Sequence, residues 1–342
     1  MRFANVILGV MGAGVVAAAG CGSSSNSGSS SSSSAGGSTS TPSSASSSSG
    51  AGACAPSSAC KVADKECLGL VDNTGKTTFG LRMSELDITA PPALATGAVQ
   101  GVVSGAVAPS DMACNLDGSA TFSWLLQFDT VAGTLKTGGA KPVADPTTGY
   151  SFDMETITQG PTMFNVAPIT YMTTPNPQTG AFTVTTGQDL VVPIFLTAAG
   201  TTVVLLPLHQ ARLLMGTLSA TQNCIGSYNA AGLLTSDSCL PAGTITQFID
   251  GGSLDGFITL EQADTVIISA LGQSLCALLA GGASSMDTMT GTAGLVCKRD
   301  ANNNIVFQGS WCEATNAPAT ATCFDSVQLT GKFAASSILI NN

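Results

Sequence analysis

The chain has little of several residue types on which binding sites and active sites often depend. Only 9% of its 342 residues are charged, and it contains one histidine, two tryptophans and three tyrosines. A single histidine, His209, excludes a metal site built from several histidines, and the HExxH motif is missing. Because no GxSxG motif is present, we expect His209 to lie at a strand end with local hydrogen bonds rather than in a serine triad.

Positive charge is also scarce, and this limits the classes of partner. The chain has 11 lysines and arginines against 21 aspartates and glutamates, a net charge of −10, and no basic cluster. This balance argues against nucleic acid or anionic lipid headgroups as ligands. The stretch LVDNTGKTTFG at 70–80 lacks the first glycine of a phosphate-binding loop, so we expect a turn there and no cofactor.

Cysteine, in contrast, is abundant, with eleven residues in the chain. None of the ten beyond position 21 has CxxC spacing, which argues against zinc ribbons and thioredoxin chemistry. An even number can pair fully, and disulfides persist outside the reducing cytosol. Spacing favours Cys224–Cys239 and Cys312–Cys323 as local pairs and leaves the other pairings open. The ten candidates are Cys54, Cys60, Cys67, Cys114, Cys224, Cys239, Cys276, Cys297, Cys312 and Cys323.

The first 21 residues have the layout of an export signal. One positive charge precedes an apolar run that ends in small residues, MRFANVILGVMGAGVVAAAG, and Cys21 follows. The tetrapeptide AAGC at 18–21 resembles the lipobox of bacterial lipoproteins, although Ala18 stands where that family usually has leucine. The resemblance implies a signal peptide at 1–20 and lipidation of Cys21 by palmitate-type acyl chains. Ordinary cleavage after 17–19 is the alternative, and it would release a soluble protein.

A serine tract separates this segment from the rest of the chain. Eighteen of the 32 residues at 22–53 are serine, and such a composition cannot bury enough apolar surface to fold. We therefore expect residues 21–53 to form a lipidated cysteine and a disordered tether, and residues 54–342 to form the folded domain. Gly22 and Ser23 follow the cysteine, and the sorting pattern of lipoproteins then implies the outer membrane of the bacterial envelope.

Periodicity in the remaining 289 residues favours strands. Apolar residues alternate at Phe79, Leu81 and Met83 and again from Phe122 to Phe128. The uncharged stretch 190–208 contains a proline and glycine and is typical of two buried strands. We predict a mainly β domain, an antiparallel sandwich or a barrel-like sheet, stapled by disulfides. It should carry one or two helices, a short one near 99–107 and a longer one from the capping-box residue Thr259 to Gly281. Its general character resembles that of secreted bacterial lipoproteins without assigned activity.

Two groups of carboxylates are candidates for chemistry. Asp153 and Glu155, two apart on an expected strand, share one face as the acid–base pair of a glycoside hydrolase would. In the stretch DGGSLDGFITLEQAD, Asp250, Asp255 and Glu261 are weak candidates for a calcium loop, because positions 1 and 12 of an EF-hand lack their carboxylates. The plain interpretations are a solvated strand face and a turn before a helix.

These observations favour an envelope-anchored lipoprotein with a non-catalytic binding or structural role. Its lipid anchor would contact the membrane, and its ligand would be a protein or a glycan. An extracytoplasmic hydrolase that acts on glycans is one alternative, and a calcium-dependent adhesion module is another. A hydrolase requires both carboxylates in a cleft, whereas a binding protein requires an accessible surface.

Overall fold

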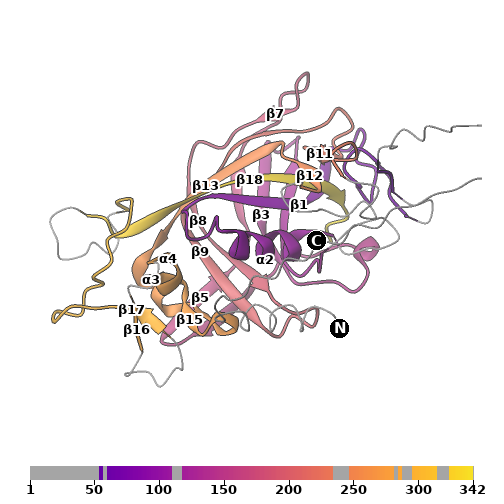
Figure 1. Cartoon of the computed structure of the whole chain (residues 1–342). Helices are drawn as coiled ribbons and strands as arrows, with labels where there is room; N and C mark the ends of the chain where they lie inside the picture. The colour runs from indigo at the N-terminus through magenta and orange to yellow at the C-terminus, as the bar shows by residue number, and fades with distance from the viewer. Residues whose placement is uncertain are drawn as a thin grey trace, which may run out of the picture. The chain divides into compact units, whose positions relative to one another are not determined.

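The computed structural model describes residues 54–56, 60–109, 118–233, 246–280, 284–286, 295–313 and 323–341. Strands make up 45% of the described residues and helices 11%, which confirms the prediction of a mainly β fold. Ten strands form one curled antiparallel sheet with the order β6-β3-β2-β1-β18-β13-β9-β7, in which β10 pairs with β18 and β8 with β9 (Figure 1). The result is a half-barrel, within the barrel-like class that the sequence predicts.

The strands of this sheet are β1 (Thr78–Ala90), β2 (Ser123–Asp129), β3 (Thr134–Ala140), β6 (Ile169–Met172), β7 (Ala181–Phe182), β8 (Gln188–Phe195), β9 (Val203–Thr217), β10 (Cys224–Ile225), β13 (Gly252–Thr259) and β18 (Ser326–Ile338). Smaller sheets are formed by β4 (Glu155–Gln159) with β5 (Thr162–Val166), by β11 (Ser227–Tyr228) with β12 (Phe248–Ile249), and by β14 (Ile267–Ile268), β15 (Gln273–Ser274), β16 (Ser284–Met286) and β17 (Leu295–Cys297). The described helices are α2 (Gly97–Val107), α3 (Leu260–Thr265) and α4 (Leu275–Leu279), with the 3-10 turns η2 (Pro146–Thr148) and η4 (Ser269–Leu271).

The main core lies on one face of the sheet and follows the alternation seen in the sequence. Phe79, Leu81 and Met83 of β1 are buried, and so are the four apolar residues predicted to share a face from Phe122 to Phe128. Helix α2 packs Val103 and Val107 into the same core. The predicted strand faces and the short helix near 99–107 are therefore confirmed.

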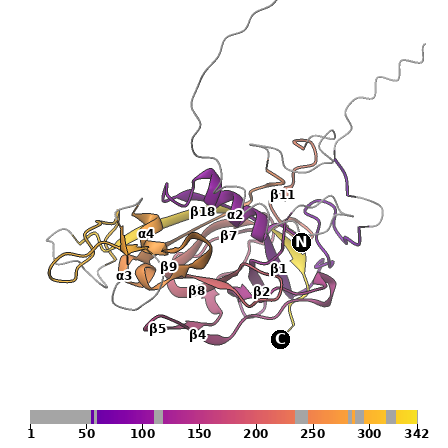
Figure 2. The same ribbon diagram turned by 60° about the horizontal axis from the view of Figure 1, so that its bottom comes forward.

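The curl of the sheet brings β8 against β3, although the two strands lie far apart in the strand order. A Cβ on Gly139 of β3 would lie 2.4 Å from Cδ of Pro193 in β8, so glycine is needed for this approach. Pro193 has no amide hydrogen and suits an edge position, since β8 pairs with β9 on its other side. Figure 2 shows the β4–β5 ribbon near β8 and α3 beside α4.

Three disulfides join described cysteines: Cys67–Cys224, Cys276–Cys297 and Cys312–Cys323, with S–S distances of 2.04, 2.01 and 2.00 Å. The predicted pair Cys312–Cys323 is confirmed. The predicted pair Cys224–Cys239 is wrong, because β10 lies beside β18 and brings Cys224 against Cys67 of the chain entry. Cys54 and Cys60 are also disulfide-bonded. Cys21, Cys114 and Cys239 lie outside the described residues.

The predicted long helix from Thr259 to Gly281 is also wrong. Helix α3 ends at Thr265, and Val266 already has an extended backbone. Residues 265–268 are Thr-Val-Ile-Ile, a β-branched run with low helix propensity, and Gly272 then takes a left-handed conformation. The apolar spacing instead places short elements β14, η4, β15 and α4 against the core. Within the described part of the chain, no helix is both long and apolar enough to cross a bilayer.

Candidate functional site

His209 lies on a bulge of β9, where the pairing of this strand with β13 slips by one residue. Phe257 pairs with His209, while Asp255 pairs with Arg212, so β9 contains one residue more than β13 between these pairs. The extra residue is accommodated by Gln210, which has a φ of 49°. A bulge turns side chains away from the regular alternation and is common beside functional sites.

The imidazole of His209 is held by two residues that are distant in sequence. Its Nδ1 lies 3.2 Å from Oδ2 of Asp189 on β8, and its Nε2 lies 2.8 Å from Oε1 of Gln262 on α3. The expectation of a strand-end histidine with local bonds is therefore wrong, because His209 lies inside β9 and its partners come from other elements. The predicted capping-box residue Gln262 bonds His209, and the Thr259 side chain makes no cap hydrogen bond.

Arg212 and Asp255 form a bidentate pair beside this histidine. Nε of Arg212 lies 2.9 Å from Oδ1 of Asp255, and the second nitrogen lies 2.5 Å from Oδ2. The hydrogen bond to Asp255 is the main cause of the raised pKa of Arg212. Asp255 and Phe257 are two apart on β13 and therefore project from the same face of the strand. A small cavity of about 10 Å³, lined in part by Tyr171, Arg212 and Asp255, has room for about one water molecule.

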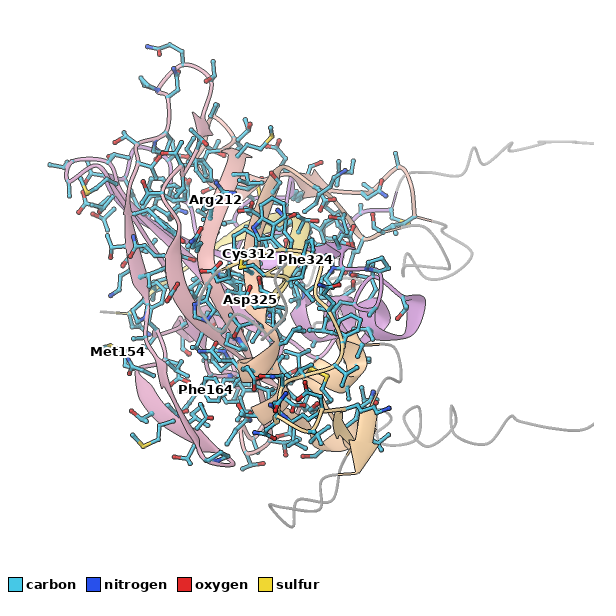
Figure 3. The ribbon with its side chains drawn as sticks, turned by 90° about the vertical axis from the view of Figure 1, so that its left-hand side faces the viewer. Met154, Phe164, Arg212, Cys312, Phe324 and Asp325 are labelled. Atoms are coloured by element: carbon cyan, nitrogen blue, oxygen red, sulfur yellow. A yellow bond between two sulfur atoms is a disulfide. The ribbon has the colours of Figure 1, made fainter. Side chains whose placement is uncertain are left out.

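Trp311 covers Phe257 and is itself open to solvent. The two rings are nearly parallel, with centroids 5.4 Å apart and an interplanar angle of 16°. Phe257 is 5% exposed and Trp311 is 46% exposed. Phe257 therefore covers part of one face of the indole, and 46% of Trp311 remains exposed to solvent. In Figure 3, Arg212, Cys312, Phe324 and Asp325 lie in one region of the side turned toward the viewer.

The segment that carries Trp311 is fixed by covalent and hydrogen bonds. The disulfide Cys312–Cys323 closes it, and the amides of Trp311 and Ser326 each donate to the carbonyl of the other, at 3.0 and 3.2 Å. Glu313 follows two residues later and donates its amide to Oδ1 of Asp325 at 2.8 Å. We call the resulting group the His209–Trp311 surface. It consists of Asp189, His209, Gln210, Arg212, Asp255, Phe257, Gln262, Trp311 and Glu313.

The pKa of Glu313, an acid of this surface, is shifted by its surroundings. Burial raises the pKa of Glu313, with smaller contributions of the same sign from Asp189 and Asp325. The neighbouring His209 and a hydrogen bond with Gln210 act in the opposite direction. Its Oε2 has no hydrogen-bond partner within the described residues. Glu313 therefore has one buried carboxylate oxygen without a partner, two residues from the exposed Trp311.

The structure brings the predicted pair Asp153 and Glu155 together around a lysine. Nζ of Lys141 lies 3.0 Å from Oε2 of Glu155 and 3.7 Å from Oδ1 of Asp153. Burial, followed by the charge of Glu155, raises the pKa of Asp153, while Lys141 acts against this shift. Met154 between them is 73% exposed and points away (Figure 3). Asp153 is buried and precedes β4, so only Glu155 lies in that strand. The two carboxyls contact one ammonium, whereas those of a hydrolase stand on opposite sides of a sugar bond.

The weak calcium candidates lie on different elements with different partners. Asp255 is in strand β13 and bonds Arg212, so the stretch forms a strand where an EF-hand would have its loop. Glu261 lies in α3 and pairs with Arg299, with an N–O distance of 2.8 Å. Asp250 precedes β13, and burial, followed by the charge of Asp87, raises its pKa to about 6. Two of the three carboxylates are thus already neutralised by arginine.

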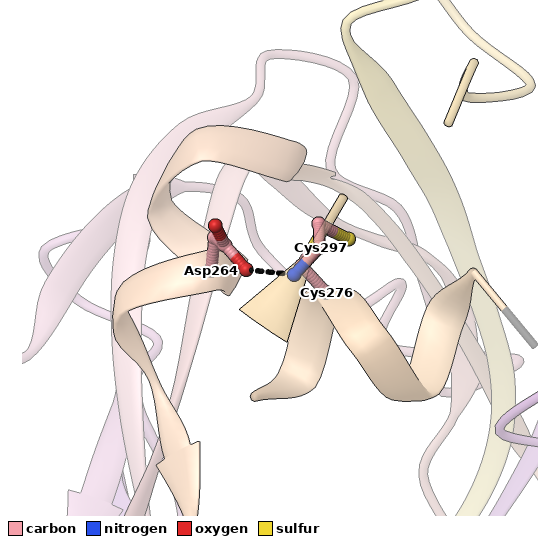
Figure 4. A group of neighbouring side chains, drawn as sticks. All are labelled: Asp264, Cys276 and Cys297. Carbon is pink, nitrogen blue, oxygen red and sulfur yellow. Dashed lines mark hydrogen bonds between the residues drawn. A yellow bond between two sulfur atoms is a disulfide. The ribbon is translucent and has the colours of Figure 1, made fainter. Parts of the chain in front are cut away.

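A further group with ligand-type atoms consists of Asp264, Cys276 and Cys297 (Figure 4). The two sulfurs are bonded to each other, so neither can act as a thiolate ligand. Oδ1 of Asp264 accepts from the amide of Cys297 at 2.7 Å and from Oγ of Ser274 at 3.0 Å, and Oδ2 accepts from Arg299 at 2.8 Å. This carboxylate therefore joins α3 to β15 and β17 and has a structural role.

Comparison with known proteins adds no assignment to this geometry. No protein-family model, curated protein or solved structure matched the chain. The residues of the His209–Trp311 surface come from four separate parts of the sequence, near 189, 209–212, 255–262 and 311–313. Sequence reasoning identified Asp255 and His209 individually, but it missed Trp311 and Glu313, for which no motif gave a signal.

Proposed function

We propose that the chain is an envelope-anchored bacterial lipoprotein whose folded domain binds a ligand without catalysing a reaction. Lipid chains on Cys21 would anchor it, residues 22–53 would tether it, and the domain from residue 54 would carry the binding surface. The observation that supports this proposal is the oxidised state of the cysteines, since all eight described cysteines are disulfide-bonded. Such bonds persist in compartments outside the cytosol.

The arrangement of polar groups supports binding over catalysis. General acid–base or nucleophilic chemistry requires a reactive group that is free to approach substrate. In the described part of the His209–Trp311 surface, both nitrogens of His209 face a partner and Arg212 is committed to Asp255. The exposed groups include the indole of Trp311, which offers contact area and no reactive atom, and the carboxylate of Asp189, which is bound to Nδ1 of His209 and to the amide of Gln210.

Lipidation is tested by replacing Cys21 with serine in the full chain expressed in a bacterial host that processes lipoproteins. We expect the wild-type protein to incorporate labelled palmitate and to partition into detergent, because two or more acyl chains anchor stably. The C21S variant should remain in the aqueous phase, and Ser23→Ala should behave as wild type. A wild-type mature chain that starts elsewhere and carries no lipid, as read by intact mass, would refute the anchor.

A further inference from the structure

We propose that the His209–Trp311 surface binds a neutral glycan, with one pyranose ring stacked on the open face of Trp311. This inference rests on the binding role proposed above and names its ligand class. Three observations carry it: the stacked and half-exposed indole, the carboxylates around it, and the rigid attachment of the segment that holds both.

The indole has the properties of a sugar platform. Phe257 lies parallel to it and fixes its orientation, so stacking a ligand on the other face costs little side-chain entropy. An aromatic face carries partial negative charge, and the C–H groups on one face of a pyranose carry partial positive charge. Contact between the two surfaces removes apolar area of both from water. A planar, solvent-facing ring is therefore suited to a flat sugar ring.

The groups beside the indole complement sugar hydroxyls. Asp189 has a side chain that is 69% exposed and is oriented by Nδ1 of His209 and by the amide of Gln210, which donates to Oδ1 at 3.1 Å. Glu313, two residues from Trp311, is half-buried with an enclosed Oε2, so it adds negative charge to the surface while Asp189 is the exposed acceptor. Carboxylates accept strong hydrogen bonds from hydroxyl groups. In this arrangement His209 is a positioning residue, because its contacts hold Asp189 and Gln262 in place.

The charge of the surface selects a neutral sugar. Asp189, Glu313 and the neighbouring Asp325 would repel uronic acids and sulfated glycans, since Arg212 is already paired with Asp255. A cationic peptide or quaternary amine is the main competing ligand, because both are attracted to carboxylates and aromatic faces. Such cations favour cages of several rings, whereas Trp311 presents one open face, and Arg212 lies on the same side of β13 as Phe257.

The tryptophan content makes the binding measurable without a label. The chain has two tryptophans, of which Trp124 is 2% exposed and Trp311 is 46% exposed. Titration of the full chain with cellotetraose and with chitotetraose should produce a saturable change in emission that arises from Trp311. Trp311→Ala should weaken binding at least about tenfold in calorimetry. Trp311→Phe should keep the stack on Phe257 and lose less than about fivefold.

Matched variants separate the site from the rest of the fold. Asp189→Asn should weaken binding about fivefold, since it replaces an exposed charged acceptor by a neutral one. Val131→Ala should bind as wild type, because Val131 is 81% exposed in the β2–β3 turn, at the end of the sheet opposite Ser326 along β18. Unchanged far-ultraviolet circular dichroism would show that Trp311→Ala is folded.

Each other outcome contradicts a stated part of the proposal. Absence of saturable binding up to about 10 mM of either sugar, a range that covers even weak millimolar affinities, would refute the glycan. Saturable binding of a lysine-rich peptide in place of sugar would assign the surface to cations. Release of reducing ends from either oligosaccharide would contradict the non-catalytic role. Asp153 and Glu155 would then be the candidates for the acid and base of a glycoside hydrolase. If the chain carries no lipid but binds sugar, only the proposed lipid anchor is refuted. If the chain is lipidated but does not bind sugar, only the proposed glycan ligand is refuted.

Discussion

Replacing Cys67 and Cys224 together by alanine is expected to lower the free energy of unfolding by up to about 5 kcal/mol. In the chain-entropy model the effect of a disulfide grows with the logarithm of the loop it closes, and 157 residues separate these two cysteines. Both residues are fully buried, and the bond joins the chain entry to β10 and hence to β18. Alanine avoids the buried hydroxyl that serine would introduce. Urea denaturation of the oxidised proteins measures the difference.

The matched control is the double alanine variant at Cys312 and Cys323. Only 11 residues separate this pair, so the same model gives about 3 kcal/mol. The remaining disulfides shorten the unfolded chain in both variants, which makes the larger figure an upper bound. A loss at Cys312–Cys323 that equals or exceeds the loss at Cys67–Cys224 would contradict the entropic account. The same variant should also weaken sugar binding, because this bond closes the segment that carries Trp311.

Local sequence patterns were sufficient to predict much of this fold. Alternation at Phe79, Leu81 and Met83 identified the buried face of β1, and the close pair Cys312–Cys323 was predictable because a short loop brings the sulfurs together. The partner of Cys224 was not predictable. It depends on β10 lying beside β18, a contact between segments more than a hundred residues apart.

The segment after Thr259 shows where pattern fails. Apolar residues at three- and four-residue spacing suit a helix, but they suit a series of short buried elements equally well. The β-branched run 265–268 favours the short elements over a continuous helix. Val266 and Ile268 pack in or against the core without being part of a helix. The low helix propensity of residues 265–268 indicated that the helix would end there, whereas the apolar spacing indicated that it would continue.

The candidate site was the least predictable part. Asp189, His209, Gln262 and Trp311 have no fixed spacing, and they meet because β9 bulges at Gln210 and the half-barrel curls. A sequence shows the residue types that such a site needs, but the closeness of these residues is a property of the folded sheet. Two tryptophans and three tyrosines are few for a sugar platform, whereas one well-supported indole is enough for the surface proposed here.

Glu85→Gln is expected to remove most of a pH dependence of stability that the native protein shows between pH 5 and pH 8. Glu85 of β1 is 6% exposed and accepts a 2.8 Å hydrogen bond from the amide of Phe248. Burial, reinforced by Asp87 and Asp250, raises the pKa of Glu85 to about 8. The positive charge that faces this group of acids is Lys332 on β18, which acts on Asp87 and Asp250.

The sign follows from proton binding. Between the unfolded pKa of 4.5 and the folded value of about 8, the native protein holds a proton that the unfolded chain has lost. Stability contributed by Glu85 is therefore greatest below pH 4.5 and is lost as pH rises toward 8. The full shift corresponds to up to about 5 kcal/mol. Asp250, with its pKa raised to about 6, adds a smaller decline of the same sign at lower pH.

Glutamine keeps the shape and the acceptor oxygen for Phe248 and cannot ionise. The unfolding free energy of E85Q should therefore exceed that of the wild type by a few kcal/mol at pH 8 and match it near pH 5. Glu66→Gln, which removes the same charge from an exposed position, should leave the difference between the two pH values unchanged. A wild-type protein that is as stable at pH 8 as at pH 5, or an E85Q variant with the wild-type slope, would show that Glu85 is ionised in the fold.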